Sequence, residues 1–235
     1  MDRTETLAEL VAQNPARAIA MDQLGLDYCC GGNERFDAAC ARSGLDPDAV
    51  AAQLDSAPVL DDTHACAEMT ITELLAHLLV AHHAYLHEEL TALDVLAAKV
   101  AGVHAERHPE LHHVHELITL ITEDLEPHLM KEERVLFPAI QRLTEGAAEF
   151  PFGSINNPIR MMGIEHERAG DLLERLRDAT HRYEPPSDGC ASYRALYERL
   201  AFLDHDTRLH IFEENHLLFP KASALEAGSV AGSPE

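Results

Sequence analysis

The stretch HLMKEERVLFP, residues 128–138, decides the fold, because its pattern returns as HIFEENHLLFP at residues 210–220. Both copies hold a histidine, a glutamate four residues later and then Leu-Phe-Pro. On an α-helix, residues i and i+4 project from one face, so each copy directs an imidazole and a carboxylate toward a common point. The repeat therefore predicts two helices that each present one histidine and one glutamate inward.

A second pair of histidines follows the same offset. His83 lies 45 residues before His128, and His166 lies 44 residues before His210. Four helices can therefore present four imidazoles and two carboxylates to one interior. Such a donor set suits iron, and six protein ligands suit two irons better than one. The predicted metal ligands are His83, His128, Glu132, His166, His210 and Glu214.

Alternatives to this ligand set remain open. A single histidine on an apolar stripe is usually a core residue with a satisfied hydrogen bond, and a partly exposed His–Glu pair needs no metal. The repetition favours a metal, since coordination offsets the cost of burying a carboxylate. Glu213, three residues after His210, is geometrically possible, although the repeat selects Glu214. His87 could take the place of His83, although the spacing to the next ligand favours His83.

Apolar residues at helical spacing surround these positions and predict an all-α fold. Thr70 and Glu73 form a capping-box pattern where the first long helix should begin. We expect an antiparallel, up-down four-helix bundle over residues 70–225. Its helices are expected at residues 71–101, at 109–143, from 157 to near Pro185, and at 190–219, with Pro220 closing the last one.

The sequence before the bundle predicts a small helical domain at residues 1–56. Asn14-Pro15 and Asp46-Pro47 each place a capping side chain before a proline at the start of a short helix. A third helix is expected at about residues 34–42. Residues 57–69, by contrast, have little apolar periodicity and are predicted to form a linker.

Two adjacent cysteines lie in the turn LDYCCGG, residues 26–32. The glycine pair permits a tight turn that would expose the thiols of Cys29 and Cys30. These thiols are candidates for transfer or docking reactions, against the alternative that they are simply small hydrophobic residues. At the other end of the chain, residues 226–235 are expected to form a disordered tail.

Charge and cysteine content exclude several classes of protein. A net charge of -23 over 235 residues, without a clustered basic face, opposes binding to nucleic acid. No run approaches the ~20 apolar residues of a membrane span, and the N-terminus lacks a signal sequence, so we expect no membrane association and a cytoplasmic location. The five cysteines are odd in number and scattered, which agrees with a reducing compartment.

Taken together, these motifs resemble the repair-of-iron-centres proteins, the iron-sulfur cluster repair di-iron family. The match covers nearly the whole chain. LDYCCGG is similar to the signature of that family's N-terminal domain, and the remainder is similar to its hemerythrin-like domain. Further matching blocks are HLMKEE at residues 128–133, EHE at 165–167 and ENHLLFP at 214–220, and the combination is specific.

The resemblance implies a non-haem di-iron centre with an oxo group between the irons and with Glu132 and Glu214 as bridging carboxylates. It also implies repair of iron-sulfur clusters damaged by nitric oxide or oxidative stress, by a homodimer whose partners are the damaged iron-sulfur proteins. We expect the protein to act by supplying iron. Whether it is an enzyme stays open, because a nitric oxide or peroxide reductase and an oxygen or nitric oxide carrier or sensor are alternative hypotheses.

One departure from the family pattern concerns the first ligand helix. Family members often carry a second histidine three positions beyond the ligand. This chain has Leu86 at that position and a histidine, His87, one residue later. The choice of His83 over His87 is therefore less constrained than the choice of the other five ligands.

Overall fold

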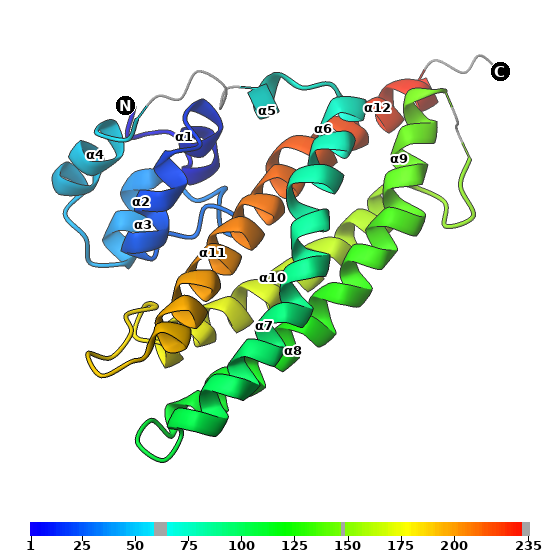
Figure 1. The fold of residues 1–235 in the computed structure, drawn as a ribbon. Helices are drawn as coiled ribbons and strands as arrows, with labels where there is room; N and C mark the ends of the chain where they lie inside the picture. The colour runs from blue at the N-terminus through cyan, green and yellow to red at the C-terminus, as the bar shows by residue number, and fades with distance from the viewer. Residues whose placement is uncertain (59–64, 147–148, 232–235) are drawn as a thin grey trace. The chain divides into compact units, whose positions relative to one another are not determined.

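The computed structural model describes residues 1–58, 65–146 and 149–231, and regular structure within these ranges is helical (Figure 1). Extended residues in the same ranges pair only as isolated bridges. The chain divides into two compact units, each with its own internal packing. Unit 1 comprises Met1–Ala76, Ala139–Asn157 and Arg208–Glu235, and unit 2 comprises His77–Pro138 and Pro158–Thr207.

Unit 2 is built from four long helical segments. They are η1 with α7 (Leu79–His83 and Ala84–His104), α8 with η2 (Glu110–Lys131 and Glu132–Leu136), most of α10 (Asn156–Ala179) and the first part of α11 (Ala191–Glu213). A short connection joins α7 to α8, and these two helices run antiparallel (Figure 1). Leucine is the most frequent residue among their buried side chains, and full burial of each leucine contributes ~1.5–3 kcal/mol to folding.

Polar contacts join each helix of unit 2 to the next. They are Asp94 to His115 between α7 and α8, Asp124 to Arg168 between α8 and α10, Asp204 to Arg177 between α10 and α11, and Glu89 to Arg199 between α7 and α11. The side chains of Arg177 and Asp204 are only 6% and 2% exposed. Because a buried charge is costly without its partner, this ion pair specifies how α10 and α11 meet.

Unit 1 contains the N-terminal helices, the segment that follows the first repeat, and the second repeat with the chain after it. Its helices are α1 (Leu7–Gln13), α2 (Arg17–Leu24), α3 (Phe36–Arg42), α4 (Pro47–Asp55), α5 (Ala65–Glu68), most of α6 (Ile71–Leu78), most of α9 (Phe137–Thr144), the end of α11, η3 (Glu214–Leu218) and α12 (Phe219–Ala231). The expected helices after Asn14-Pro15, near residues 34–42 and after Asp46-Pro47 correspond to α2, α3 and α4.

Side-chain caps explain where several of these helices begin. Asp46 accepts a hydrogen bond from the amide of Asp48 at 3.0 Å, and Thr70 and Glu73 form the expected capping box. Helix α1 was not predicted, although the sequence carries its signal. Thr6 and Glu9 form a reciprocal capping box, in which the Thr6 amide donates to the Glu9 carboxylate at 2.8 Å.

A wider π-helical turn interrupts the helix beside each predicted carboxylate ligand. The turns η2 and η3 begin at Glu132 and Glu214, and their carbonyls accept from the amides five residues later, those of Phe137 and Phe219. The expectation that Pro220 closes the last helix is wrong, because the chain continues as α12. Pro220 lies in the first turn of α12, directly after η3, so the helix continues through a residue that has no backbone N–H to donate.

The ends of the predicted segments differ from the helix ends. α12 continues through Ala231, across the boundary at residue 226 where we expected a tail, and residues 232–235 lie outside the described residues. Residues 59–64 of the expected linker also lie outside them. Among the described residues, none of the helices combines the length and the apolar character that crossing a membrane requires.

Candidate metal centre

The first copy of the repeat places its histidine and glutamate together in the interior of unit 2. His128 lies in the last turn of α8, and Glu132 opens η2. Nε2 of His128 is 3.2 Å from Oε1 of Glu132, and the two side chains are 2% and 0% exposed. The spacing i to i+4 thus sets an imidazole and a carboxylate against one another, as the sequence predicts.

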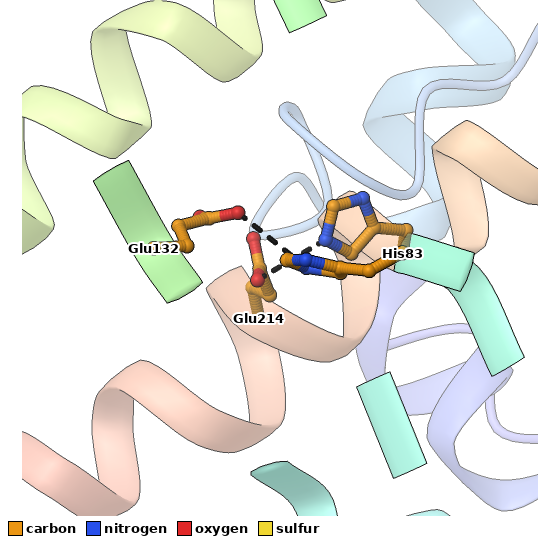
Figure 2. A group of neighbouring side chains, drawn as sticks. His83, Glu132 and Glu214 are labelled. Carbon is orange, nitrogen blue, oxygen red and sulfur yellow. Dashed lines mark ion pairs between the residues drawn. The ribbon is translucent and has the colours of Figure 1, made fainter. Parts of the chain in front are cut away.

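Two further predicted histidines of unit 2 meet the same carboxylate. Nε2 of His83, at the end of η1, lies 3.6 Å from Oε2 of Glu132 (Figure 2). Nε2 of His166, on α10, lies 4.0 Å from Oε1 of the same residue. A fully buried carboxylate among three imidazole nitrogens is a donor set that suits iron, and a cation there would offset the cost of burying it.

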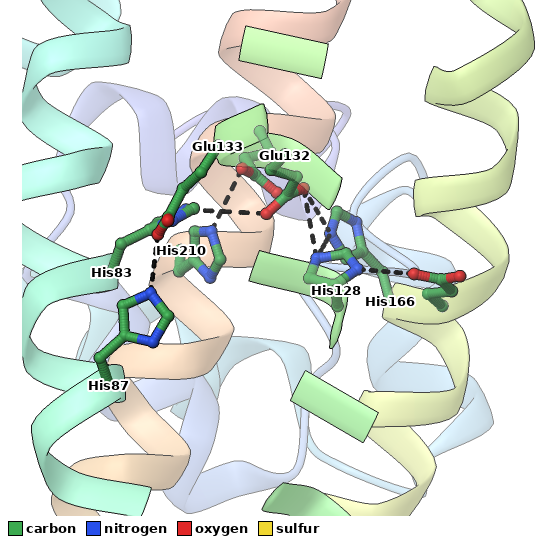
Figure 3. Close-up of polar contacts among 9 residues, drawn as sticks. His83, His87, His128, Glu132, Glu133, His166 and His210 are labelled. Atoms are coloured by element: carbon green, nitrogen blue, oxygen red, sulfur yellow. Dashed lines mark hydrogen bonds and ion pairs between the residues drawn. The ribbon is translucent and has the colours of Figure 1, made fainter. Parts of the chain in front are cut away.

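In two of these imidazoles, a carboxylate contacts the other ring nitrogen, Nδ1. Nδ1 of His83 lies 3.0 Å from Oε1 of Glu133, and Nδ1 of His128 lies 3.0 Å from Oε2 of Glu165 (Figure 3). When Nδ1 carries the proton and donates to a carboxylate, Nε2 keeps its lone pair for a metal. The contacts therefore orient both rings with Nε2 toward Glu132.

These two carboxylates stay ionised. The hydrogen bond from His128, with help from Lys131, lowers the pKa of Glu165 to about 2 although burial opposes it. Burial raises the pKa of Glu133, but its contacts with His87 and His83 outweigh that effect, and the net shift is downward. Ionised carboxylates are the stronger acceptors, which favours the ring orientation just described.

His83 and His87 occupy different environments. The His83 side chain is 1% exposed and faces Glu132, and its ring packs on Phe137 with centroids 5.2 Å apart. The His87 side chain is 40% exposed, and its Nε2 lies 2.7 Å from Oε1 of Glu133 (Figure 3). This geometry supports His83 as the ligand and gives His87 the role of a second partner for Glu133.

The second copy of the repeat has the same internal geometry in unit 1. His210 lies near the end of α11, and Glu214 opens η3. Nε2 of His210 is 3.1 Å from Oε1 of Glu214, and both side chains are 0% exposed. Each copy therefore builds the same buried imidazole and carboxylate pair, followed by the same π-helical turn.

The cysteine turn differs from the expectation. Cys29 is 0% exposed rather than accessible, whereas Cys30 is partly exposed. The thiol of Cys29 lies 3.9 Å from that of Cys30, and this hydrogen bond, together with burial, raises the pKa of Cys29 well above its usual value. Burial follows because Asp27 ties down the turn, accepting from the amides of Cys29, Cys30 and Gly31 at 3.1, 2.9 and 2.8 Å.

Sequence reasoning missed four residues that contact the predicted ones. Glu133 and Glu165 hold ligand histidines, while Asn215 and His216 contact the backbone of the cysteine turn. Each of the four lies within two residues of a predicted ligand and inside one of the sequence blocks that resemble the family, HLMKEE, EHE and ENHLLFP. Glu133 stands at i+5 from His128, a spacing that points the two side chains apart on a helix. Its actual partners lie on another helical segment.

Comparison with known proteins covers nearly the whole chain. Residues 74–222 match the model of the hemerythrin HHE cation binding domain, and residues 3–58 match ScdA_N, a domain of unknown function. The iron-sulfur cluster repair protein YtfE of Enterobacter sp. (strain 638) is 35% identical over 227 residues, which are 95% of this chain and 99% of that protein. Proteins of the same name from Escherichia coli O81 (strain ED1a) and Escherichia fergusonii are each 34% identical over the same shares.

Proposed function

Because the chain belongs to the hemerythrin HHE cation binding domain family and to the family of the iron-sulfur cluster repair proteins, we propose that it binds two non-haem iron ions. The fold class agrees with this membership, since the chain is helical throughout its described elements and has a helical N-terminal region before the hemerythrin-like domain. The proposed ligands are His83, His128, Glu132, His166, His210 and Glu214, with the two glutamates as bridges beside an oxo group.

The burial of Glu132 among three imidazole nitrogens carries this proposal. The matched domain spans both copies of the repeat, which supports assigning His210 and Glu214 to the same centre. Imidazole and carboxylate oxygen bind iron without the all-thiolate environment of a permanent electron carrier. Within the chain, Glu133 and Glu165 orient the imidazoles. The buried carboxylates are negatively charged and complement the positive charge of a bound cation.

We propose that iron held in this way is supplied to iron-sulfur clusters damaged by nitric oxide or oxidative stress. The names of the relatives support this function. The client is then a damaged iron-sulfur protein, and the protein acts in the cytoplasm as a homodimer. The five cysteines lie among the described residues and none of them is in a disulfide, which agrees with a reducing compartment.

Recovery of a damaged client tests the proposal. Iron-loaded protein is mixed anaerobically with nitric-oxide-damaged aconitase, and return of aconitase activity is followed. The control is Glu132→Leu protein mixed with the same total amount of free ferrous iron. We expect the wild-type protein to restore more activity than this control. Recovery no greater than that given by free iron would end the proposal, and release of nitrous oxide without recovery would assign a reductase instead.

A further inference from the structure

Two side chains of η3 bind one backbone carbonyl of the cysteine turn. Nδ2 of Asn215 donates to the carbonyl oxygen of Cys29 at 3.2 Å, and Nε2 of His216 lies 2.9 Å from the same oxygen. A carbonyl oxygen has two lone pairs, so both contacts can be hydrogen bonds at once. All three residues belong to unit 1, and Asn215 directly follows Glu214.

Close packing accompanies these hydrogen bonds. A Cβ atom at Gly32 would lie 2.5 Å from Nε2 of His216 and 2.2 Å from the carbonyl oxygen of Tyr28, so only glycine fits there. The His216 ring also lies against Phe212, with centroids 5.5 Å apart, and Phe212 meets the Tyr28 ring edge-on at 6.0 Å. The cysteine turn therefore packs closely against η3 and the end of α11.

The other polar groups of the turn are held by Asp27. Its carboxylate accepts from three successive amides, and it also lies 3.2 Å from the thiol of Cys29. The amides are thus fixed from within the turn and the carbonyl from η3. With both sides of the backbone held, Cys29 is enclosed, while the residue Cys30 remains partly exposed.

We propose that Asn215 and His216 are positioning residues that hold Cys29 shielded and present Cys30 as the reactive thiol of the pair. A thiol must be reached before it can react, so the order of reactivity follows from exposure as well as from ionisation. The raised pKa of Cys29 acts in the same direction. Loss of the two hydrogen bonds to the Cys29 carbonyl should then expose the Cys29 thiol without unfolding the helices.

Alkylation rates test this assignment in the full-length protein. Iodoacetamide labelling is followed separately at each cysteine by mass spectrometry of peptides, in wild type and in the Asn215→Leu/His216→Leu double variant. We expect Cys30 to react at least about tenfold faster than Cys29 in wild type. The double variant should raise the Cys29 rate about tenfold, because the loss of both hydrogen bonds lets the turn open more often.

Two further variants separate positioning from general stability. His216→Gln keeps an N–H donor near the place of Nε2 and should return the Cys29 rate toward that of wild type. His113→Leu removes an exposed histidine of unit 2 and should change nothing. Cys40 is 0% exposed, so its alkylation reports unfolding. If Cys40 of the double variant is alkylated, the single Asn215→Leu variant replaces it. The measure is then the ratio of the Cys29 rate to the Cys40 rate in that variant.

Two results would overturn the assignment. One is equal reactivity of Cys29 and Cys30 in wild type, and the other is an unchanged Cys29 rate in a folded variant that lacks the η3 donors. The measurement is made on iron-free protein, so it fails or succeeds independently of iron binding and cluster repair. A protein that repairs no cluster could still show the predicted order of thiol reactivity.

Discussion

The two π-helical turns η2 and η3 follow the same motif but serve different neighbours. Each opens with a buried glutamate four residues after a histidine. In η2 the next residue, Glu133, contacts the imidazoles of His83 and His87. In η3 the next two residues, Asn215 and His216, bind the carbonyl of Cys29. The two copies thus share the proposed ligand pair, while the residues directly after it have different partners.

The chemistry of the adjacent residues matches those tasks. A carboxylate that accepts from the N–H of a ligand imidazole fixes the tautomer of the ring and raises the basicity of its other nitrogen. Glu133 therefore suits a position beside two histidines. A carbonyl oxygen accepts only, so it needs donors such as the Asn215 amide and the His216 ring. Exchanging these residue types between the copies would leave the Cys29 carbonyl facing a carboxylate that cannot donate, and the His83 N–H facing a neutral amide, which is a weaker acceptor than an ionised carboxylate.

Removing a proposed bridge should have the largest effect. Glu132→Leu and Glu214→Leu each delete a carboxylate that we assign to both irons, and each should lower iron content from two per chain to one or none. The leucine suits the buried position, so helix content should persist. Iron is quantified after anaerobic purification, with the exposed Glu126→Leu as control. Two irons bound by both bridge variants would contradict the bridging assignment.

The first-helix ligand is the next test. His83→Ala removes the buried imidazole that faces Glu132 and should abolish most iron binding. His87→Ala removes an exposed ring that contacts only Glu133 among the residues described above, and it should lose much less. Iron titration of both variants decides between them. A greater loss in the His87 variant would reverse the choice of ligand.

Residues that follow the bridges should affect iron differently in the two copies. Glu133→Leu leaves the His83 ring without its orienting carboxylate, and iron affinity should fall about 10–100-fold. Asn215→Leu should change that affinity by no more than about twofold, because the side chain serves the cysteine turn. Competition with a chromophoric chelator measures both. Equal losses of iron affinity in the two variants would mean that Asn215 supports iron binding as Glu133 does.

Glycine substitutions test the packing of the cysteine turn. Gly32→Ala forces a Cβ against the Tyr28 carbonyl and the His216 ring and should destabilise the protein by ~1–3 kcal/mol. Gly163→Ala on α10 meets nothing within 4 Å and should be neutral or stabilising by up to ~1 kcal/mol. Urea unfolding of the iron-free variants provides the comparison. Unchanged or increased stability of Gly32→Ala would show that the turn is not closely packed.

Acid sensitivity should show the smallest difference. The pKa of Glu165 is about 2 in the folded protein and 4.5 in its ordinary state. Its ionised form therefore stabilises the fold fully above pH 4.5, and that contribution is lost as the pH falls toward about 2. Glu165→Gln cannot titrate, so iron-free variant protein should lose less stability than wild type across this window. Thermal unfolding at several pH values measures the slope, and parallel slopes would contradict the role of Glu165.

Helix positions and the ligand pattern could be predicted because they depend on local spacing. The i to i+4 pairs of the two copies, the capping box at Thr70 and Glu73 and the cap before Pro47 require only neighbouring residues. The expected cap at Asn14 is wrong, because α2 begins at Arg17 after Ala16 and has no side-chain cap. The continuation beyond Pro220 could not, because it depends on a π-helical turn whose hydrogen bonds span five residues. The partners of Glu133 and Glu165 likewise lie on other helical segments.

The sequence by itself determined that the chain is helical and that histidines and glutamates recur in two equivalent copies, since helical periodicity is a property of adjacent turns. Only the tertiary structure decided that Glu133 serves His83, that Glu165 serves His128 and that Cys29 is enclosed while Cys30 is not. Those outcomes depend on which side chains, distant in the chain, come within hydrogen-bonding distance of one another. The spacing of residues along one helix does not determine contacts with other helices.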